Sequence, residues 1–363
     1  MMYTDSDAHH GRRRQRDWSQ EDKGMTQQLT PDDRRLSWQG AVSFNDTSGW
    51  RMPWRIPHER IGLYPPDSLR ERAAMPAGVR ISFHTDTEFL AGHVEPVEEC
   101  GSIDLYCNGD FHGSVALSGQ SGFRFDGLPD GDKLIELWLP QHGEFRLRGM
   151  EISGEASISP YANPRPRWVT YGSSITHCRT ARSPSFTWPA VAARVYGMNL
   201  TCLGYGGNCH LEPMIARLMR ELPANFLSMK VGINIYGSGS LNSRTFQPAV
   251  IGFVQIVREK HPDTPFVVIS PVFSPPRETT PNAVGFTLAE MRQEVEEAVE
   301  VMRDQGDLNL HYVSGLELFG PDLAHLLPDD LHPDAEGYEI MGQNFVDRVA
   351  SRFFLKNQVA SAG

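Results

Sequence analysis

The first half of the chain is marked by short stretches in which apolar and polar residues alternate. Residues 79–84 run Val-Arg-Ile-Ser-Phe-His, and residues 123–125 and 145–148 follow the same period of two. That period is typical of strands with one buried face and one face in water. Asn108-Gly109, between two such stretches, is a hairpin signal. The pattern therefore predicts an all-β sandwich or jelly roll over about residues 36–158.

From Trp168 onward the pattern changes to apolar runs that alternate with stretches of helical periodicity. The run Phe266-Val267-Val268-Ile269 is continuous, as expected for a strand covered on both faces. Strand–helix alternation predicts a parallel sheet with helices packed on it. The expected strands are 168–171, 199–204, 226–235, 265–271 and 308–314. The expected helices are 185–197 (with Ser185 as N-cap and Gly197 as the stop), 210–222, 243–261, 288–305 and 335–354.

The two patterns are separated by a proline-rich stretch, residues 159–166, which contains three prolines and cannot form a regular ladder. Because this connection is short, we expect the two domains to be docked against each other. The predicted organisation is a disordered polar tail (1–30), a β-sandwich domain (31–160), a linker (161–167), an α/β domain (168–357) and a short tail (358–363).

Composition excludes some classes of function. Lys plus Arg is 34 and Asp plus Glu is 45, so the chain carries a formal charge of −11, which disfavours nucleic-acid binding. No apolar run approaches the roughly 20 residues that span a bilayer, and the first residues are polar. The five cysteines are odd in number and lack disulfide spacing, so reduced thiols are expected. These features predict a cytoplasmic protein; they leave its oligomeric state open.

Candidate catalytic residues follow successive predicted strands, at the sheet edge where ligands bind. Ser174 lies in Tyr-Gly-Ser-Ser-Ile-Thr after the first strand, Gly207 in a glycine-rich turn after the second, and Asn234 at the end of the third. Asp329 and His332 share a later loop, where a carboxylate can orient an imidazole that accepts a serine proton. Each feature alone is more often an ordinary loop, turn or strand-end cap. Their shared order makes a catalytic site the stronger hypothesis.

These four blocks together resemble the SGNH hydrolase (GDSL-type esterase/lipase) superfamily. The resemblance implies a flavodoxin-like three-layer α/β/α fold from residue 168 to about 355, and no metal or cofactor. The preceding β domain resembles the amino-terminal jelly roll of a subgroup that includes carbohydrate deacetylases and natural-product acyltransferases. The implied roles are nucleophile for Ser174, oxyanion donors for the Ser174 N–H, the Gly207 N–H and the Asn234 side chain, base for His332, and its orienting partner for Asp329.

The chain departs from the family pattern at a few positions. Ser173 stands where an Asp usually precedes the nucleophile, and Ile235 stands where Asp is common in the third block. Asp330 is adjacent to Asp329 and competes for the orienting role, although block alignment favours Asp329. None of these departures removes a group that must carry a proton.

Other side chains near the blocks have two interpretations. Tyr205, Tyr236, His177 and Phe273 are candidates for a substrate pocket, with core packing as the alternative. His177-Cys178 and Cys209-His210 are zinc-ligand types, but pairs of adjacent residues do not have the usual ligand spacing, so we predict no metal site.

The leading hypothesis is a serine enzyme that forms an acyl-enzyme from a small-molecule ester and passes the acyl group to water. The first alternative is an acyltransferase that uses the same groups, with a carbohydrate or natural-product hydroxyl as acceptor. The second alternative, from another class, is a catalytically silent protein whose β domain binds carbohydrate.

Overall fold

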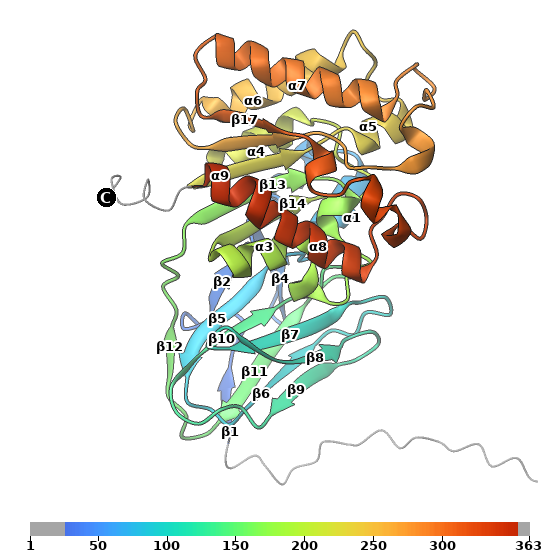
Figure 1. Cartoon of the computed structure of the whole chain (residues 1–363). Coiled ribbons are helices and arrows are strands. Elements are labelled where there is room, and N and C mark those ends of the chain that lie inside the picture. The colour runs from blue at the N-terminus through green and yellow to red at the C-terminus, as the bar shows by residue number, and fades with distance from the viewer. Residues whose placement is uncertain (1–25, 355–363) are drawn as a thin grey trace, which may run out of the picture.

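The computed structural model describes residues 26–354, which form a β sandwich followed by an α/β half (Figure 1). Blue-to-green strands of the sandwich lie below the green-to-red α/β half in that view. The sandwich strands are β1 (Thr26–Leu29), β2 (Ser37–Gln39), β3 (Ser43–Asp46), β4 (Arg51–Trp54), β5 (Arg80–Thr85), β6 (Phe89–Val94), β7 (Ser102–Cys107), β8 (Asp110–Ala116), β9 (Gly122–Asp126), β10 (Lys133–Trp138), β11 (Leu147–Ser153) and β12 (Ile158–Pro160).

The sandwich consists of two antiparallel sheets, as the alternating pattern predicts. One has the order β3-β4-β11-β6-β9 with β1 also on β11, and the other β12-β5-β10-β7-β8 with β2 also on β5. Apolar side chains such as Ile81 and Phe83 fill the space between them. The predicted hairpin joins β7 to β8, and both Asn108 and Gly109 have the positive φ that a two-residue turn of this kind requires.

The predicted tail of residues 1–30 is too long at its carboxyl end. Thr26–Leu29 form β1, which pairs with β11 and buries Leu29. One apolar residue and a free strand edge are enough to order a segment that looks polar in sequence. Residues 1–25 and 355–363, which include the rest of both predicted tails, lie outside the described residues.

Part of the polar face of β5 is not in water. Arg80 and Ser82 are almost completely buried, and Arg80 lies against the α/β half, whereas His84 is partly exposed. Arg80 donates to the Leu200 carbonyl oxygen (3.1 Å) and the Asn199 side-chain oxygen (2.5 Å). In addition, helix α1 (Asp67–Ala73) interrupts the predicted all-β region after two prolines. The alternation identified the strand correctly but could not show what covers its second face.

The α/β half is a parallel five-stranded sheet between two layers of helices, as predicted. Its strand order is β14-β13-β15-β16-β17, the flavodoxin-like order. The strands are β13 (Arg167–Gly172), β14 (Asn199–Gly204), β15 (Phe226–Lys230), β16 (Phe266–Ile269) and β17 (Leu310–Val313); the helices are α2 (Ser174–His177), α3 (Trp188–Tyr196), α4 (Pro213–Glu221), α5 (Ile233–Ser238), α6 (Phe246–Arg258), α7 (Leu288–Asp304), α8 (Ala335–Phe345) and α9 (Ser351–Phe353).

The two faces of β13 show how the layers are held. Trp168 packs against Trp188 of α3 and Phe345 of α8, whereas Tyr171, which points to the opposite face, stacks on Phe253 of α6. Helices α3 and α8 therefore cover one face, and the row α4, α6 and α7 covers the other. Among residues 26–354, no helix is both long enough and apolar enough to cross a membrane.

Several predicted element ends are wrong, including the start of the first long helix and the end of the third strand. Thr187, not Ser185, caps α3 by accepting from the Ala190 N–H, while Gly197 ends the helix as expected. The third strand stops at Lys230, because Gly232 adopts φ +117° and α5 begins at Ile233. Asn234 therefore lies in the first turn of a helix rather than at a strand end.

The two halves share one hydrophobic core, so the expectation of docked domains is confirmed. Trp54, Tyr106 and Trp138 of the sandwich belong to the same buried cluster as Ile175 and Tyr205 of the α/β half. Movement of one half against the other would expose these side chains to water.

Candidate active site

Ser174 is the first residue of the short helix α2, directly after strand β13. Ser173 is fully buried and caps this helix, with its hydroxyl oxygen accepting from the Ile175 N–H at 3.2 Å. Ser174 is only half-buried, so a ligand can reach its hydroxyl. The two adjacent serines thus have different environments: one stabilises the turn and the other faces outward.

The predicted Ser, His and Asp residues meet at this turn although they are far apart in the sequence. Ser174 Oγ lies 2.9 Å from His332 Nε2, and His332 Nδ1 lies 2.7 Å from Asp329 Oδ2. These distances allow the imidazole to accept the serine proton while its other nitrogen donates to a carboxylate.

Asp329, rather than Asp330, contacts the His332 ring. The backbone N–H groups of Leu331 and His332 also donate to Asp329 Oδ1. Partial burial acts to raise the pKa of Asp329, but the hydrogen bonds from the His332 ring and backbone outweigh it and hold that pKa below its ordinary value. Asp330 serves the loop through its backbone: its carbonyl oxygen accepts from Ser274 Oγ at 2.6 Å.

The three donors proposed for an oxyanion have no hydrogen-bond acceptor in the described part of the chain. Among the hydrogen bonds of residues 26–354, none has the Ser174 N–H, the Gly207 N–H or the Asn234 Nδ2 as donor. The Asn234 side chain is nevertheless fixed, because its Oδ1 accepts from the Cys209 N–H at 3.1 Å. The amide NH₂ is therefore held ready to donate to a ligand. Gly207 adopts φ +76°, a conformation that a side chain would strain.

A buried pair supports the loop that follows Gly207. Tyr171 donates from its hydroxyl to Glu212 Oε2 (2.5 Å), and the His210 N–H donates to Glu212 Oε1 (3.0 Å). Burial raises the pKa of the Glu212 carboxyl. Sequence inspection did not identify this pair: Tyr171 belongs to the motif around Ser174, but Glu212 belongs to no motif, and their 41-residue separation gives no local signal.

Two of the predicted pocket residues are packing residues instead. Tyr205 is completely buried, and its hydroxyl donates to the Arg55 carbonyl oxygen (2.7 Å), so it offers no surface to a substrate. His177 is buried as well; its Nε2 lies 2.6 Å from the Gln141 carbonyl oxygen. Burial, assisted by the nearby Arg55 charge, lowers the pKa of His177 well below its ordinary value. The His177 ring is therefore neutral, which is compatible with its burial, and its contact with Gln141 joins the two halves.

Tyr236 and Phe273 remain candidates for the pocket. Tyr236 is largely buried on α5, and its hydroxyl donates to the Thr280 carbonyl oxygen at 2.9 Å. Phe273 is half-buried and precedes Ser274, which holds the loop that carries His332. Both side chains lie on segments that also carry or support site residues.

The cysteines next to the motifs are poor nucleophiles. Cys178 and Cys209 are completely buried, and burial raises the pKa of the Cys209 thiol to about 12. A thiol of such pKa stays protonated and unreactive at neutral pH. Within residues 26–354 no group of three or more His, Cys, Asp or Glu side chains is arranged to hold a metal ion.

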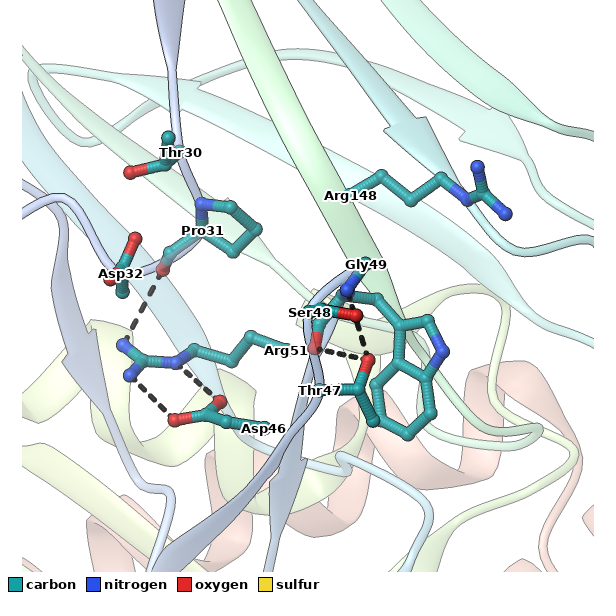
Figure 2. A pocket seen from close by; sticks show the side chains of 10 residues that line it. Thr30, Pro31, Asp32, Asp46, Thr47, Ser48, Gly49, Arg51 and Arg148 are labelled. Atoms are coloured by element: carbon teal, nitrogen blue, oxygen red, sulfur yellow. Dashed lines mark hydrogen bonds and ion pairs between the residues drawn. The ribbon is translucent and has the colours of Figure 1, made fainter.

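A surface hollow of about 290 Å³ lies elsewhere, on the sandwich (Figure 2). It is formed by residues 30–32 and 46–51 together with Arg148. Arg51 crosses it to form a bidentate ion pair with Asp46 and a bond to the Pro31 carbonyl oxygen. None of the predicted site residues lines this hollow.

Comparison with known families matches both halves of the chain. Residues 166–349 match the model of the GDSL-like lipase/acylhydrolase family, and residues 36–148 match that of the SsfX3 N-terminal domain. No protein with a curated function has a matching sequence.

Solved structures show the same two-part architecture. A salicylyl-acyltransferase, SsfX3, from a tetracycline biosynthetic pathway is 36% identical over 93% of this chain and 98% of its own, with a TM-score of 0.83. A candidate GDSL-like lipase from Bacteroides ovatus is 22% identical (91% and 99% covered, TM-score 0.76). A family two carbohydrate esterase from Cellvibrio japonicus is 13% identical (91% and 98% covered, TM-score 0.64). At these lower identities the last two show likeness of fold only.

Proposed function

Because the chain belongs to the GDSL-like lipase/acylhydrolase family, we propose that it transfers acyl groups from small-molecule esters through Ser174. The observation that carries the proposal is the continuous contact from Ser174 Oγ through His332 to Asp329. Beside it lie three donors that have no acceptor among residues 26–354. A catalytically silent protein has no need to keep such donors unpaired.

The chemistry follows from these positions. Ser174 Oγ attacks the ester carbonyl and its proton passes to His332 Nε2, while Asp329 stabilises the imidazolium that forms. The carbonyl oxygen gains negative charge, which the Ser174 and Gly207 N–H groups and the Asn234 amide stabilise. Collapse of this intermediate breaks the ester bond, the leaving alcohol takes the proton from His332, and the acyl group remains on Ser174. An incoming hydroxyl then repeats the steps in reverse.

We propose that the incoming hydroxyl belongs to an acceptor molecule, with water as the alternative. Support comes from the acyltransferase that is 36% identical to this chain over almost its whole length. A natural-product alcohol is the acceptor class that this likeness favours; a carbohydrate hydroxyl is the second.

The function is tested with p-nitrophenyl acetate, butyrate and benzoate, each with and without added polyketide or sugar alcohols. We expect turnover that disappears in Ser174→Ala, and ester products that increase with acceptor concentration. Free acid as the only product at every acceptor concentration would make the enzyme a hydrolase. If none of the esters shows Ser174-dependent turnover, the proposal is wrong.

The neighbouring aspartates provide a matched pair of variants. Asp329→Asn is expected to lower kcat by about 10³- to 10⁴-fold, because the amide cannot stabilise the imidazolium. Asp330→Asn is expected to keep nearly normal activity, since Asn tolerates the left-handed backbone at this position (φ 57°). Steady-state kinetics of both variants decide the assignment, and a larger loss in Asp330→Asn would reverse it.

Loss of the Asn234 amide should affect the rate far more than binding. Asn234→Ala is expected to lower kcat by about 10²- to 10³-fold, the usual effect of removing one oxyanion donor. KM should change little, because this hydrogen bond strengthens mainly in the transition state. Asn344→Ala is a matched control: this helical Asn also makes an amide contact, to the Leu318 carbonyl oxygen, but belongs to no predicted site. A lower melting temperature with near-normal kcat in Asn234→Ala would give Asn234 a purely structural role.

We also propose that the protein acts in the cytoplasm. All five cysteines lie in the described part of the chain as free thiols, and four are buried, which supports a reducing compartment. Cell fractionation combined with thiol alkylation tests this; recovery from an oxidising compartment would contradict it.

A further inference from the structure

Arg55 is a buried arginine of the sandwich that reaches into the α/β half. It follows strand β4 and is completely inaccessible to solvent. Its guanidinium donates to four backbone carbonyl oxygens: those of Met75 (2.6 Å), Arg72, Cys202 (3.1 Å) and Gly204 (2.7 Å). None of the ion pairs found among residues 26–354 includes Arg55.

A buried cation without a carboxylate is costly, and burial lowers the pKa of Arg55. Aligned carbonyl dipoles offset that cost only while they keep their positions around the planar guanidinium. The guanidinium group of Arg55 therefore constrains the backbone segments that supply its acceptors. Two of these acceptors, the carbonyl oxygens of Cys202 and Gly204, belong to the carboxyl-terminal end of β14.

The constrained segment leads directly into the proposed oxyanion turn. Gly204 is the last residue of β14, and Gly207 is three positions later. The Tyr205 side chain also returns to Arg55: its hydroxyl donates to the Arg55 carbonyl oxygen, and the guanidinium carbon lies 5.1 Å from the centre of its ring. The Tyr205 N–H donates to the Gly172 carbonyl oxygen at 2.8 Å, which connects the turn to the end of β13, two residues before Ser174.

The same strand end packs against the helix of the nucleophile. A side-chain carbon added at Gly204 would lie only 2.6 Å from the His177 backbone nitrogen, so β14 and α2 meet backbone to backbone. Farther along the turn, Ser68 of α1 donates to Asn208 Oδ1 at 2.8 Å. Two residues of the sandwich half thus contact the turn on either side of Gly207: Arg55 at Gly204, and Ser68 at Asn208.

We propose that Arg55 is a positioning residue for the oxyanion site, through which the sandwich takes part in catalysis. The inference rests on the proposed function. Arg55 touches neither substrate nor reacting atoms; it fixes where the Gly207 N–H stands relative to Ser174. Correct placement of a donor before reaction is what makes it effective, so a small displacement lowers the rate without preventing substrate binding.

Arg80 provides a matched control, because it also contacts β14. Arg80 is equally buried and also crosses from the sandwich to β14, but it binds the opposite end, at Asn199 and Leu200. Arg55→Lys and Arg80→Lys each keep the charge and lose the planar fork. Both should destabilise the junction between the halves, but only the first should disturb the turn before Gly207.

The experiment compares kcat, KM, melting temperature and inhibition by an alkylboronic acid, which forms a tetrahedral adduct on a serine. For Arg55→Lys we expect kcat to fall by about 10- to 10²-fold, with KM nearly unchanged. The upper value is the usual effect of deleting one oxyanion donor completely. Boronate inhibition should weaken by a similar factor. Arg80→Lys should lower the melting temperature comparably and keep kcat and boronate inhibition close to those of the unaltered enzyme.

Equal kcat losses in the two variants, or an unchanged kcat in Arg55→Lys, would overturn the inference. If Arg55→Lys does not fold, Tyr205→Phe replaces it, because this change removes only the hydroxyl bond to Arg55. A reduced kcat with weaker boronate inhibition in Tyr205→Phe supports the inference, and parental values for both contradict it. Ester turnover by the unaltered enzyme and by Ser174→Ala is measured first. If there is no Ser174-dependent turnover, the proposed function fails and this inference fails with it. If there is, the result for Arg55→Lys tests this inference alone.

Discussion

Replacement of Ser174 by alanine is expected to remove nearly all ester turnover, a loss of about 10⁴-fold or more in kcat. The variant loses the only hydroxyl that lies within hydrogen-bond distance of His332 Nε2 among the contacts of residues 26–354. Stability should change little, because the Ser174 side chain is half-buried and makes this one contact. The measurements are turnover of a p-nitrophenyl ester and thermal unfolding on the same preparation.

Ser173→Ala is the matched control for that variant. It removes the hydroxyl that caps α2, so it should lower the free energy of unfolding by about 1 kcal/mol. It should keep most of the activity, since Ser173 is buried and does not contact His332. The opposite result, an inactive Ser173→Ala and an active Ser174→Ala, would move the nucleophile by one residue.

His332→Ala is expected to cause the second large loss, of similar size to that of Ser174→Ala, because the serine then has no base within reach. Combining the two changes should lower the rate little further, since both residues serve the same proton transfer. His325→Ala, in the exposed segment just before the loop, is the control; its Nδ1 contacts only the Asp322 carbonyl oxygen. Kinetics of the single and double variants provide the test, and fully additive losses would argue against a shared proton transfer.

Local sequence signals were sufficient for much of the fold. A period of two identified β5, and an Asn-Gly pair placed the β7–β8 hairpin, because both features depend on neighbouring residues only. An Asp–His contact in this loop could be predicted for the same reason, since Asp329 and Asp330 both lie within three positions of His332. The order of strands and helices then indicated which edge of the sheet would bring Ser174 to them.

For two of the wrong predictions, the deciding partner was distant in sequence. Arg80 was expected in water, yet it is buried because β14, about 120 residues later, covers it. Tyr205 was a pocket candidate, yet its hydroxyl is used by Arg55, 150 residues earlier. Nothing near either residue in the sequence indicates such a partner, since two of the acceptors, the Leu200 and Arg55 carbonyl oxygens, are backbone groups that every residue possesses.

The sequence by itself was enough to predict the class of fold from periodicity, and to name candidate site residues from their order along the chain and from the resemblance to a family. Only the tertiary structure decided that Asp329 rather than Asp330 contacts the His332 ring, that Asn234 lies in a helix, and that Arg55 of the sandwich donates to the Gly204 carbonyl oxygen before the turn. Those outcomes depend on backbone direction and on which carbonyl oxygens converge, and both are fixed only when the two halves pack into one core.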